Sequence, residues 1–240
     1  PDAVNVTRQQ RREKLLGSVR STGKSRFKKD GLFRGYDAAL TESLRLSGPN
    51  FMRVFDLKSE SADLRESYGS EFGQRCLLAR RLVQRGVRFV EISHNLNFVN
   101  GTGWDTHNQG QANQHLLIKQ LDQAVSTLVD DLEKRKLLDS TLIVITTEFG
   151  RPPEFDAGGG RGHQSTAFSS LFLGGGMKTG QVIGQTDELG KKIVNHPVSI
   201  PDFHATLFKA LGIDHQAELH DGDRPVPITD RGNPVRELFA

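Results

Sequence analysis

Three separate segments of the chain carry side chains that could bind a metal ion and an anionic ligand. They supply two carboxylates, two imidazoles and two guanidiniums: Asp105, His107, Glu148, Arg151, Arg161 and His163. Carboxylate and imidazole together suit Zn²⁺ or Mn²⁺ better than Ca²⁺, which prefers oxygen ligands only. The forked guanidinium of arginine suits a tetrahedral oxyanion such as sulfate or phosphate.

Asp105 and His107 lie in the glycine-rich stretch GTGWDTHNQG, which also holds the only tryptophan, Trp104. Side chains alternate along an extended chain, so Asp105 and His107 would point the same way. We expect Trp104 to be the hydrophobic anchor of this loop, with the glycines letting the chain turn.

The elements that must position these residues alternate between helix and strand. The apolar patterns predict helices over 70–85, 111–132 and 200–212 and strands over 87–93, 140–149 and 168–176. This order predicts an α/β fold with a mainly parallel sheet and helices on both faces. The near-continuous apolar run of the strand 140–149 is typical of a central parallel strand.

The longest predicted helix has one apolar face that should pack on the sheet, formed by Leu117, Leu121, Val125, Leu128 and Leu132. In open α/β sheets the ligand site lies beyond the carboxyl ends of the strands. The strand 87–93 leads to His94 and then to Asp105, and the strand 140–147 leads to Glu148. The candidate residues should therefore meet at one edge of the sheet.

Each candidate also has a structural interpretation. Asp105 could shape a turn or cap a helix with His107 as its partner, and Glu148 could pair with Arg151. Single residues of these types are more often structural than catalytic. Their delivery by three segments to one predicted edge favours a site.

The first 35 residues are strongly basic. They hold ten Lys/Arg and three Asp/Glu, a net charge of +7, against +3 for the whole chain. We predict a charged helix over 4–20 and a linker over 21–35, so that 1–35 form a peripheral arm and 36–240 the α/β domain. Such an arm could contact nucleic-acid phosphates, but it has few aromatic residues, and we favour a solvated helix.

Bulk properties exclude some classes. Mean hydropathy is −0.47 and no apolar window approaches the length of a membrane span. Cys76 is the single cysteine, which excludes an intrachain disulfide and a cysteine-based zinc site.

Several motifs, in order, resemble the bacterial DUF1501 family: GWDTHNQ, LDSTLIVITTEFGR, GRGH, FLGGGMKTGQVIGQTDELG and PDFHATLFKALGID. The resemblance runs from about residue 50 to the end. It implies a sulfatase-like fold of the alkaline phosphatase superfamily, of which this chain would be a C-terminal part without the first strand and the nucleophile. It also implies export from the cell.

The resemblance assigns roles to the candidates. Asp105, His107, Glu148 and His163 would bind one or two divalent ions, and Arg151 and Arg161 would bind the anion. Three positions depart from the expected pattern. Phe149 stands where the superfamily has another ligand, Gly162 stands where the family usually has Asp, and Pro152 stands where it usually has Thr.

The implied activity is metal-dependent hydrolysis of a sulfo- or phosphoester, on a small anionic ester or a sulfated glycan. An alternative is a non-catalytic relative that binds a sulfated or phosphorylated ligand in the same cleft, which Phe149 and Gly162 favour. A third is nucleic-acid binding through the basic arm.

Overall fold

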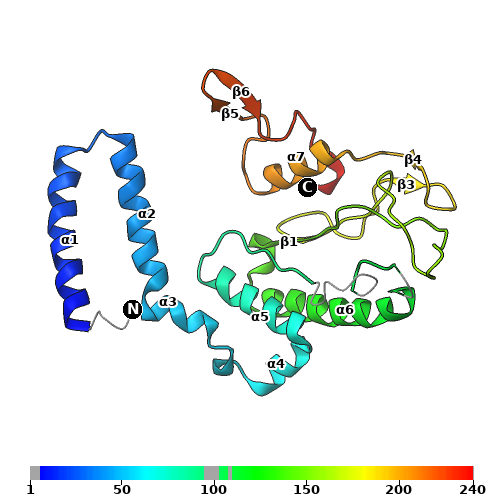
Figure 1. Cartoon of the computed structure of the whole chain (residues 1–240), viewed down its shortest axis with the longest axis horizontal. Helices are drawn as coiled ribbons and strands as arrows, with labels where there is room; N and C mark the ends of the chain where they lie inside the picture. Colours follow the sequence, from blue (N-terminus) through cyan, green and yellow to red (C-terminus); the bar gives the residue numbers. More distant parts are fainter. Residues whose placement is uncertain (1–5, 95–102, 108–109, 240) are drawn as a thin grey trace. The chain divides into compact units, whose positions relative to one another are not determined.

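The computed structural model describes residues 6–94, 103–107 and 110–239 (Figure 1). The chain divides into two compact units, Pro1–Asp56 and Leu57–Ala240. Among the described residues, the secondary-structure elements of unit 1 are all helices, whereas unit 2 combines helices with three short two-stranded sheets.

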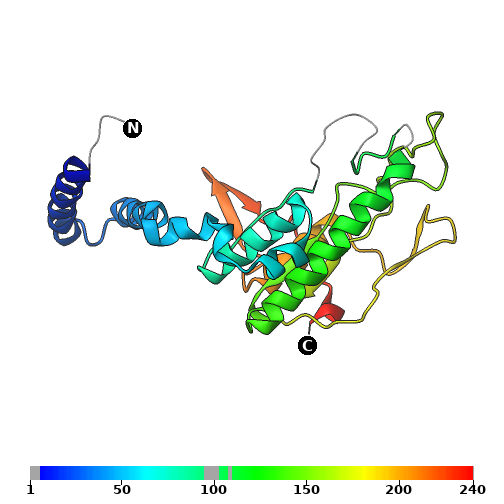
Figure 2. The same cartoon turned by 90° about the horizontal axis from the view of Figure 1, so that it is seen from below.

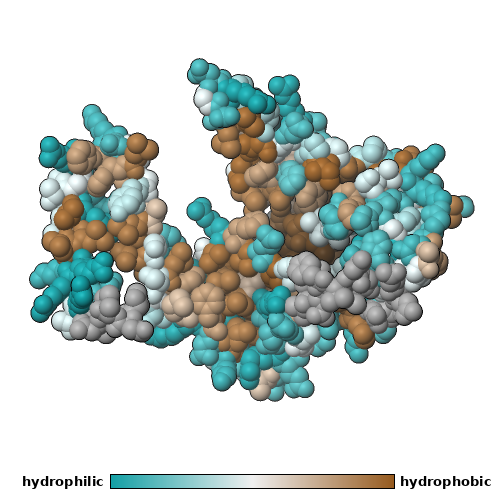
Figure 3. Space-filling view, viewed as in Figure 1, coloured by the Kyte–Doolittle hydropathy of each residue, from teal (hydrophilic) through white to brown (hydrophobic). Residues whose placement is uncertain are grey.

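Unit 1 is a hairpin of two long helices followed by short helical turns. Its elements are α1 (Val6–Arg26), α2 (Gly31–Ser47), α3 (Pro49–Met52) and η1 (Arg53–Phe55). The two long helices lie side by side (Figures 1 and 2). No residue of α2 is buried. Brown areas of hydrophobic residues are visible on this hairpin in Figure 3. Large side chains that are exposed on it include Leu15, Val19, Leu32 and Tyr36.

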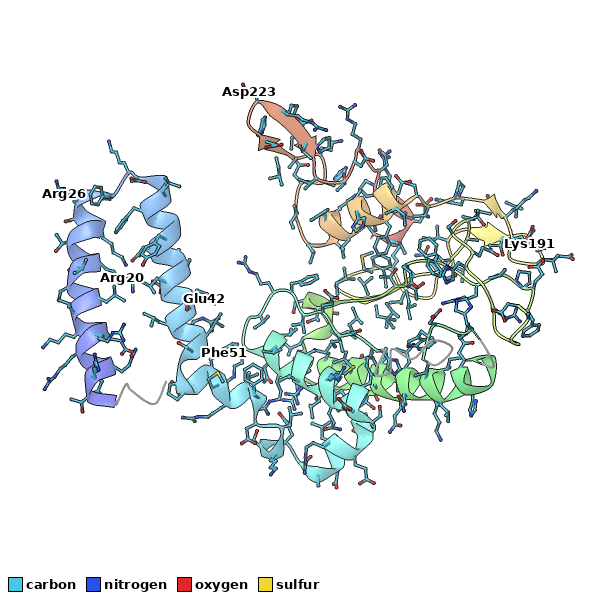
Figure 4. The ribbon with its side chains drawn as sticks, in the orientation of Figure 1. Arg20, Arg26, Glu42, Phe51, Lys191 and Asp223 are labelled. Atoms are coloured by element: carbon cyan, nitrogen blue, oxygen red, sulfur yellow. The ribbon has the colours of Figure 1, made fainter. Side chains whose placement is uncertain are left out.

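The linker predicted at 21–35 is wrong, because α1 runs to Arg26 and α2 begins at Gly31. The Asp30 side chain starts α2 by accepting hydrogen bonds from two backbone N–H groups. Arg20 extends from α1 to Asp37 of α2, at 2.7 Å between Nε and Oδ1 (Figure 4). These contacts join residues across the turn, and no local pattern reveals them.

Unit 2 begins with three helices and continues into strands and loops. Its helical elements are η2 (Leu57–Ser59), α4 (Ala62–Tyr68), α5 (Glu71–Gln84), α6 (Gly110–Lys134), η3 (Leu138–Ser140), α7 (Ile200–Ala210) and η4 (Arg236–Leu238). Its strands are β1 (Leu142–Ile145), β2 (Leu171–Gly174), β3 (Gln185–Thr186), β4 (Ile193–Asn195), β5 (Glu218–Asp221) and β6 (Arg224–Pro227). The helices predicted over 70–85, 111–132 and 200–212 are thereby confirmed.

The hydrophobic core lies between α4, α5 and α6, which pack side by side (Figures 1 and 2). Its buried members are Tyr68, Phe72, Cys76, Leu77, Ala124, Leu128 and Leu132. Leu121 of α6 and Ile143 of β1 are partly buried against this cluster. The predicted apolar face of α6 is therefore used, but it packs mainly on α4 and α5 instead of on a sheet.

The described strands pair differently from the expectation. β1 and β2 are antiparallel, with Leu142 opposite Gly174 and Ile145 opposite Leu171. A parallel pair needs a crossover, usually a helix, whereas a loop without a helix joins these two strands. The segment 87–93 forms no strand, because it pairs with no neighbour among the described residues. The predicted α/β fold with a parallel sheet stays a prediction.

Among the described residues, no helix has both the length and the apolar character that crossing a membrane would require.

Candidate metal centre

The loop 151–163, which follows β1, carries three of the six candidate residues: Arg151, Arg161 and His163. Gly150 and Gln164 form an isolated antiparallel bridge, with both N–H···O distances at 2.9 Å. A Cβ atom on Gly150 would lie 2.1 Å from the carbonyl oxygen of Ala167, so only glycine fits this crossing. The bridge brings the two ends of the loop 151–163 together and so places His163 beside Phe149.

The described part of the loop that contains Trp104, residues 103–107, lies against the closed loop 151–163. The backbone N–H of Arg161 donates to the carbonyl of Thr106 at 2.8 Å, and Thr106 is fully buried. A Cβ atom on Gly160 would lie 2.0 Å from the same carbonyl oxygen. Gly160 thus permits the close approach that brings the residues on either side of Thr106 to His163.

Three of the four predicted ligands meet at this contact. Asp105, His107 and His163 each offer one ligand atom, and these atoms all lie within 4.8 Å of one another. His107 Nε2 is 3.2 Å from Asp105 Oδ1 and 3.2 Å from His163 Nε2. Ligands bound to Zn²⁺ at about 2.0–2.1 Å in a tetrahedron lie roughly 3.3 Å apart. The three residues, which we call the ligand group, therefore have two pairs of atoms at the spacing of such a shell.

The ligand group is open on one side. Asp105 and His107 are partly buried, whereas His163 is exposed. Phe149 packs on the His163 ring, with centroids 4.2 Å apart, and fixes it from one face. Three protein ligands with an accessible remaining position are typical of catalytic metal sites, whereas structural zinc sites have four protein ligands.

Glu148, the fourth predicted ligand, is exposed and does not belong to the ligand group. The chain bends at Glu148, and residues 146–148 are all exposed, whereas the next residue, Phe149, packs on the His163 ring.

The two predicted anion-binding arginines hold the loops together. Arg151 donates from Nη2 to Asp105 Oδ1 at 2.9 Å and from Nη1 to the carbonyl of Arg161 at 3.0 Å. Arg161 donates to the carbonyl of Pro152 at 2.8 Å and lies over the Phe155 ring. Their role as anion ligands stays a prediction.

The sequence analysis missed Asp156. Its Oδ2 lies 3.1 Å from His107 Nδ1, and its Oδ1 accepts from the backbone N–H groups of Gly158 and Gly160 at 3.1 and 2.9 Å. The hydrogen bond from His107, aided by those of the glycines and opposed by partial burial, lowers the pKa of Asp156. An Asp two residues before a glycine was a turn signal, but nothing local linked it to His107.

Trp104 reaches the core through a histidine. Its ring meets His94 edge-on at 5.6 Å, and His94 stacks on Phe72 of α5 at 3.9 Å. Burial lowers the pKa of His94, although its hydrogen bond with Gln120 acts in the opposite direction. Trp104 is thus linked to α5 through His94, whereas its predicted role as the anchor that holds the loop against the sheet stays a prediction, and His94 lies outside the ligand group.

Comparisons with known proteins bear on the whole chain. A family model described as "Protein of unknown function (DUF1501)" matches residues 1–239. No curated protein and no solved structure gave a significant match. The family match includes the basic N-terminal residues, which lay outside the resemblance seen in the sequence motifs. The chain therefore belongs to the DUF1501 family.

Proposed function

We propose that Asp105, His107 and His163 hold a divalent transition-metal ion, and that this centre serves the hydrolysis of a sulfate or phosphate ester. The convergence of the three ligand atoms within 4.8 Å carries the proposal, with His107 Nε2 at 3.2 Å from an atom of each of the other two residues, close to the edge of a tetrahedral shell. The mixed nitrogen and oxygen donors favour Zn²⁺ or Mn²⁺. A sulfatase-like fold of the alkaline phosphatase superfamily belongs to the same proposal.

A divalent ion in such a site supplies Lewis-acid polarisation of an anionic ester. Residues of this chain would hold and orient the ion. Asp105 provides the negative charge, and Arg151 holds that carboxylate in place at 2.9 Å. The imidazoles of His107 and His163 present their Nε2 atoms to the same point.

The proposal assigns the metal-holding role to this chain and does not assign a nucleophile. Two hydroxyls stand next in sequence to predicted ligands. Thr106 Oγ1 is buried beside the ligand group and has no hydrogen-bond partner among the described residues, whereas Thr147, next to Glu148, donates from Oγ1 to the carbonyl of Phe149 at 3.1 Å.

The second candidate function is metal-dependent binding of a sulfated or phosphorylated ligand without hydrolysis. It is favoured by Arg151 and Arg161, whose guanidiniums donate to protein acceptors. A hydrolase would need such groups to meet charge that develops on the ester.

Calorimetric titration with Zn²⁺ and Mn²⁺ tests the metal centre. We expect about one ion per chain in the unmodified protein and at least a roughly tenfold loss of affinity in Asp105→Ala and His163→Ala. His220→Ala, on the exposed strand β5, is the matched control and should bind normally. Equal binding by all four proteins would contradict the proposal.

Assays with an aryl sulfate and an aryl phosphate on the metal-loaded protein separate the two candidates. Turnover that Asp105→Ala abolishes supports the hydrolase. Metal binding without turnover, together with tighter binding of inorganic sulfate or phosphate when the ion is present, supports the non-catalytic function.

A further inference from the structure

The two ring nitrogens of His107 face different partners. Nε2 lies in the ligand group, 3.2 Å from both Asp105 Oδ1 and His163 Nε2. Nδ1 faces away from that group, 3.1 Å from Asp156 Oδ2. A neutral imidazole can bind a metal ion only through the nitrogen that carries no proton.

Asp156 is itself fixed by the closed loop. Its Oδ1 accepts hydrogen bonds from the N–H groups of Gly158 and Gly160, which leaves Oδ2 as the atom presented to His107. An ionised carboxylate offers acceptors only, so Asp156 favours the tautomer with the proton on Nδ1, in competition with the Asp105 carboxylate at 3.2 Å from Nε2, which also accepts from Arg151. The Nε2 lone pair is then directed at the ligand group.

We propose that Asp156 is the positioning residue of the metal centre: it sets the His107 tautomer and ring orientation, and it couples both to closure of the loop 156–160. The inference rests on the proposed metal centre. Metal-binding histidines in proteins usually donate their second N–H to a carboxylate or carbonyl, which fixes the ring and raises its basicity.

The geometry gives Asp156 two tasks that an asparagine cannot perform together. The side chain of Asn has the same shape, but it has one oxygen and one NH₂ group. If the oxygen accepts from Gly158 and Gly160, the NH₂ faces Nδ1 and favours the tautomer with the proton on Nε2. If the oxygen faces Nδ1, the NH₂ meets two N–H donors and the loop closure is lost. Asp156→Asn therefore tests the positioning role with little change in volume.

The first readout is the ¹⁵N spectrum of the His107 ring in the metal-free protein at a pH where the ring is neutral. We expect the unmodified protein to carry the proton on Nδ1 and Asp156→Asn to shift it toward Nε2. A proton on Nε2 in the unmodified protein would overturn the inference without any variant. A purely structural role for Asp156 would leave this signature unchanged.

The second readout is Zn²⁺ affinity, which should fall about 10–100-fold in Asp156→Asn. The matched control is Asp187→Asn, because Asp187 closes the β3–β4 turn through Oδ1 and the N–H of Lys191, at 2.7 Å (Lys191 is labelled in Figure 4). This control should keep normal affinity. Unchanged affinity in Asp156→Asn would contradict the positioning role.

The two proposals fail in different ways. If the unmodified protein binds no ion, the proposed metal centre is wrong, whatever the tautomer. If it binds an ion through Asp105 and His163 while Asp156→Asn has no effect on the tautomer or the affinity, only the inference about Asp156 is wrong.

Discussion

Unit 2 contains two groups of charged side chains that differ in how deeply they are buried and in how their charges are paired. The first, which we call the core ion network, lies between α5 and α6 and consists of Glu60, Arg80, Arg81, Asp131 and Arg135 with the hydroxyl of Tyr68. The second is the ligand group with its neighbours in the loops, Arg151 and Asp156.

The core ion network is largely buried, and its charges are paired with one another. Arg80 has 1% of its side chain exposed and lies 2.7 Å from Asp131 and 3.0 Å from Glu60. Burial raises the pKa of a carboxyl, but hydrogen bonds from Arg135 and Tyr68 and the charge of Arg80 hold the pKa of Asp131 below its usual range. Each charge has a fixed partner, so the network has no capacity left for a ligand.

The ligand group is neither sealed nor satisfied by protein alone. Asp105 has 45% of its side chain exposed, and two imidazole nitrogens face each other at 3.2 Å. Only one hydrogen bond can form between them, whereas an ion could bind both. The comparison teaches that buried charges which pair with one another leave no position for a ligand. Converging ligand atoms with an open side indicate a site.

The largest effect should come from breaking the core ion network. Asp131→Ala leaves Arg80 buried without its closest partner and should lower the free energy of unfolding by about 3–5 kcal/mol. Urea denaturation measures this loss. The matched control is Arg75→Ala, which removes an exposed pair with Glu71 on α5 and should cost about 0–1 kcal/mol. Equal losses of unfolding free energy in the two variants would contradict the distinction between the buried network and the exposed ion pair.

Metal addition should act on the ligand group alone. At a free Zn²⁺ concentration about 100 times Kd, binding adds about 2.7 kcal/mol and raises Tm by roughly 5–10 °C. Thermal melts should show this gain in the unmodified protein and in Glu60→Gln, but not in Asp105→Ala. A rise in Tm that persists in Asp105→Ala would show that the ion binds at another place in the protein.

Acid should weaken the core ion network. Although burial acts the other way, hydrogen bonds from Arg80 and Arg81 keep the pKa of Glu60 below its ordinary value, so its stabilisation is complete above about pH 4.3 and lost below it. The free energy of unfolding should therefore fall between about pH 5 and pH 3. We expect a smaller effect than that of Asp131→Ala, since protonation leaves the oxygens in place.

The check is the slope of unfolding free energy against pH. Glu60→Gln should flatten it, whereas Glu71→Gln, at an exposed carboxylate, should change it much less. An unchanged slope in Glu60→Gln would show that this carboxyl does not link folding to pH.

The smallest effect is expected from Asp105→Asn without metal. Asp105 is about half exposed and its pair with Arg151 is screened by solvent, so the loss should stay below about 1 kcal/mol. Urea denaturation in the presence of a chelator measures it. A loss as large as that of Asp131→Ala would mean that Asp105 is a structural residue.

The sequence by itself determined the helices over 71–84, 110–134 and 200–210, because amphipathic spacing and end signals lie within a few neighbouring residues. It also identified Asp105, His107 and His163 as chemically capable, since residue type and loop context are local properties. Neither the helix positions nor the chemical capability of these residues requires knowledge of distant contacts.

Tertiary structure alone decided which residues meet. Asp156 is 49 positions from His107, and Asp131 is 51 positions from Arg80, so neither pairing is written in a local pattern. The antiparallel pairing of β1 with β2 likewise depends on how the intervening loop closes at Gly150. Glu148 was a reasonable ligand by type, but it lies exposed at a bend of the chain and outside the ligand group.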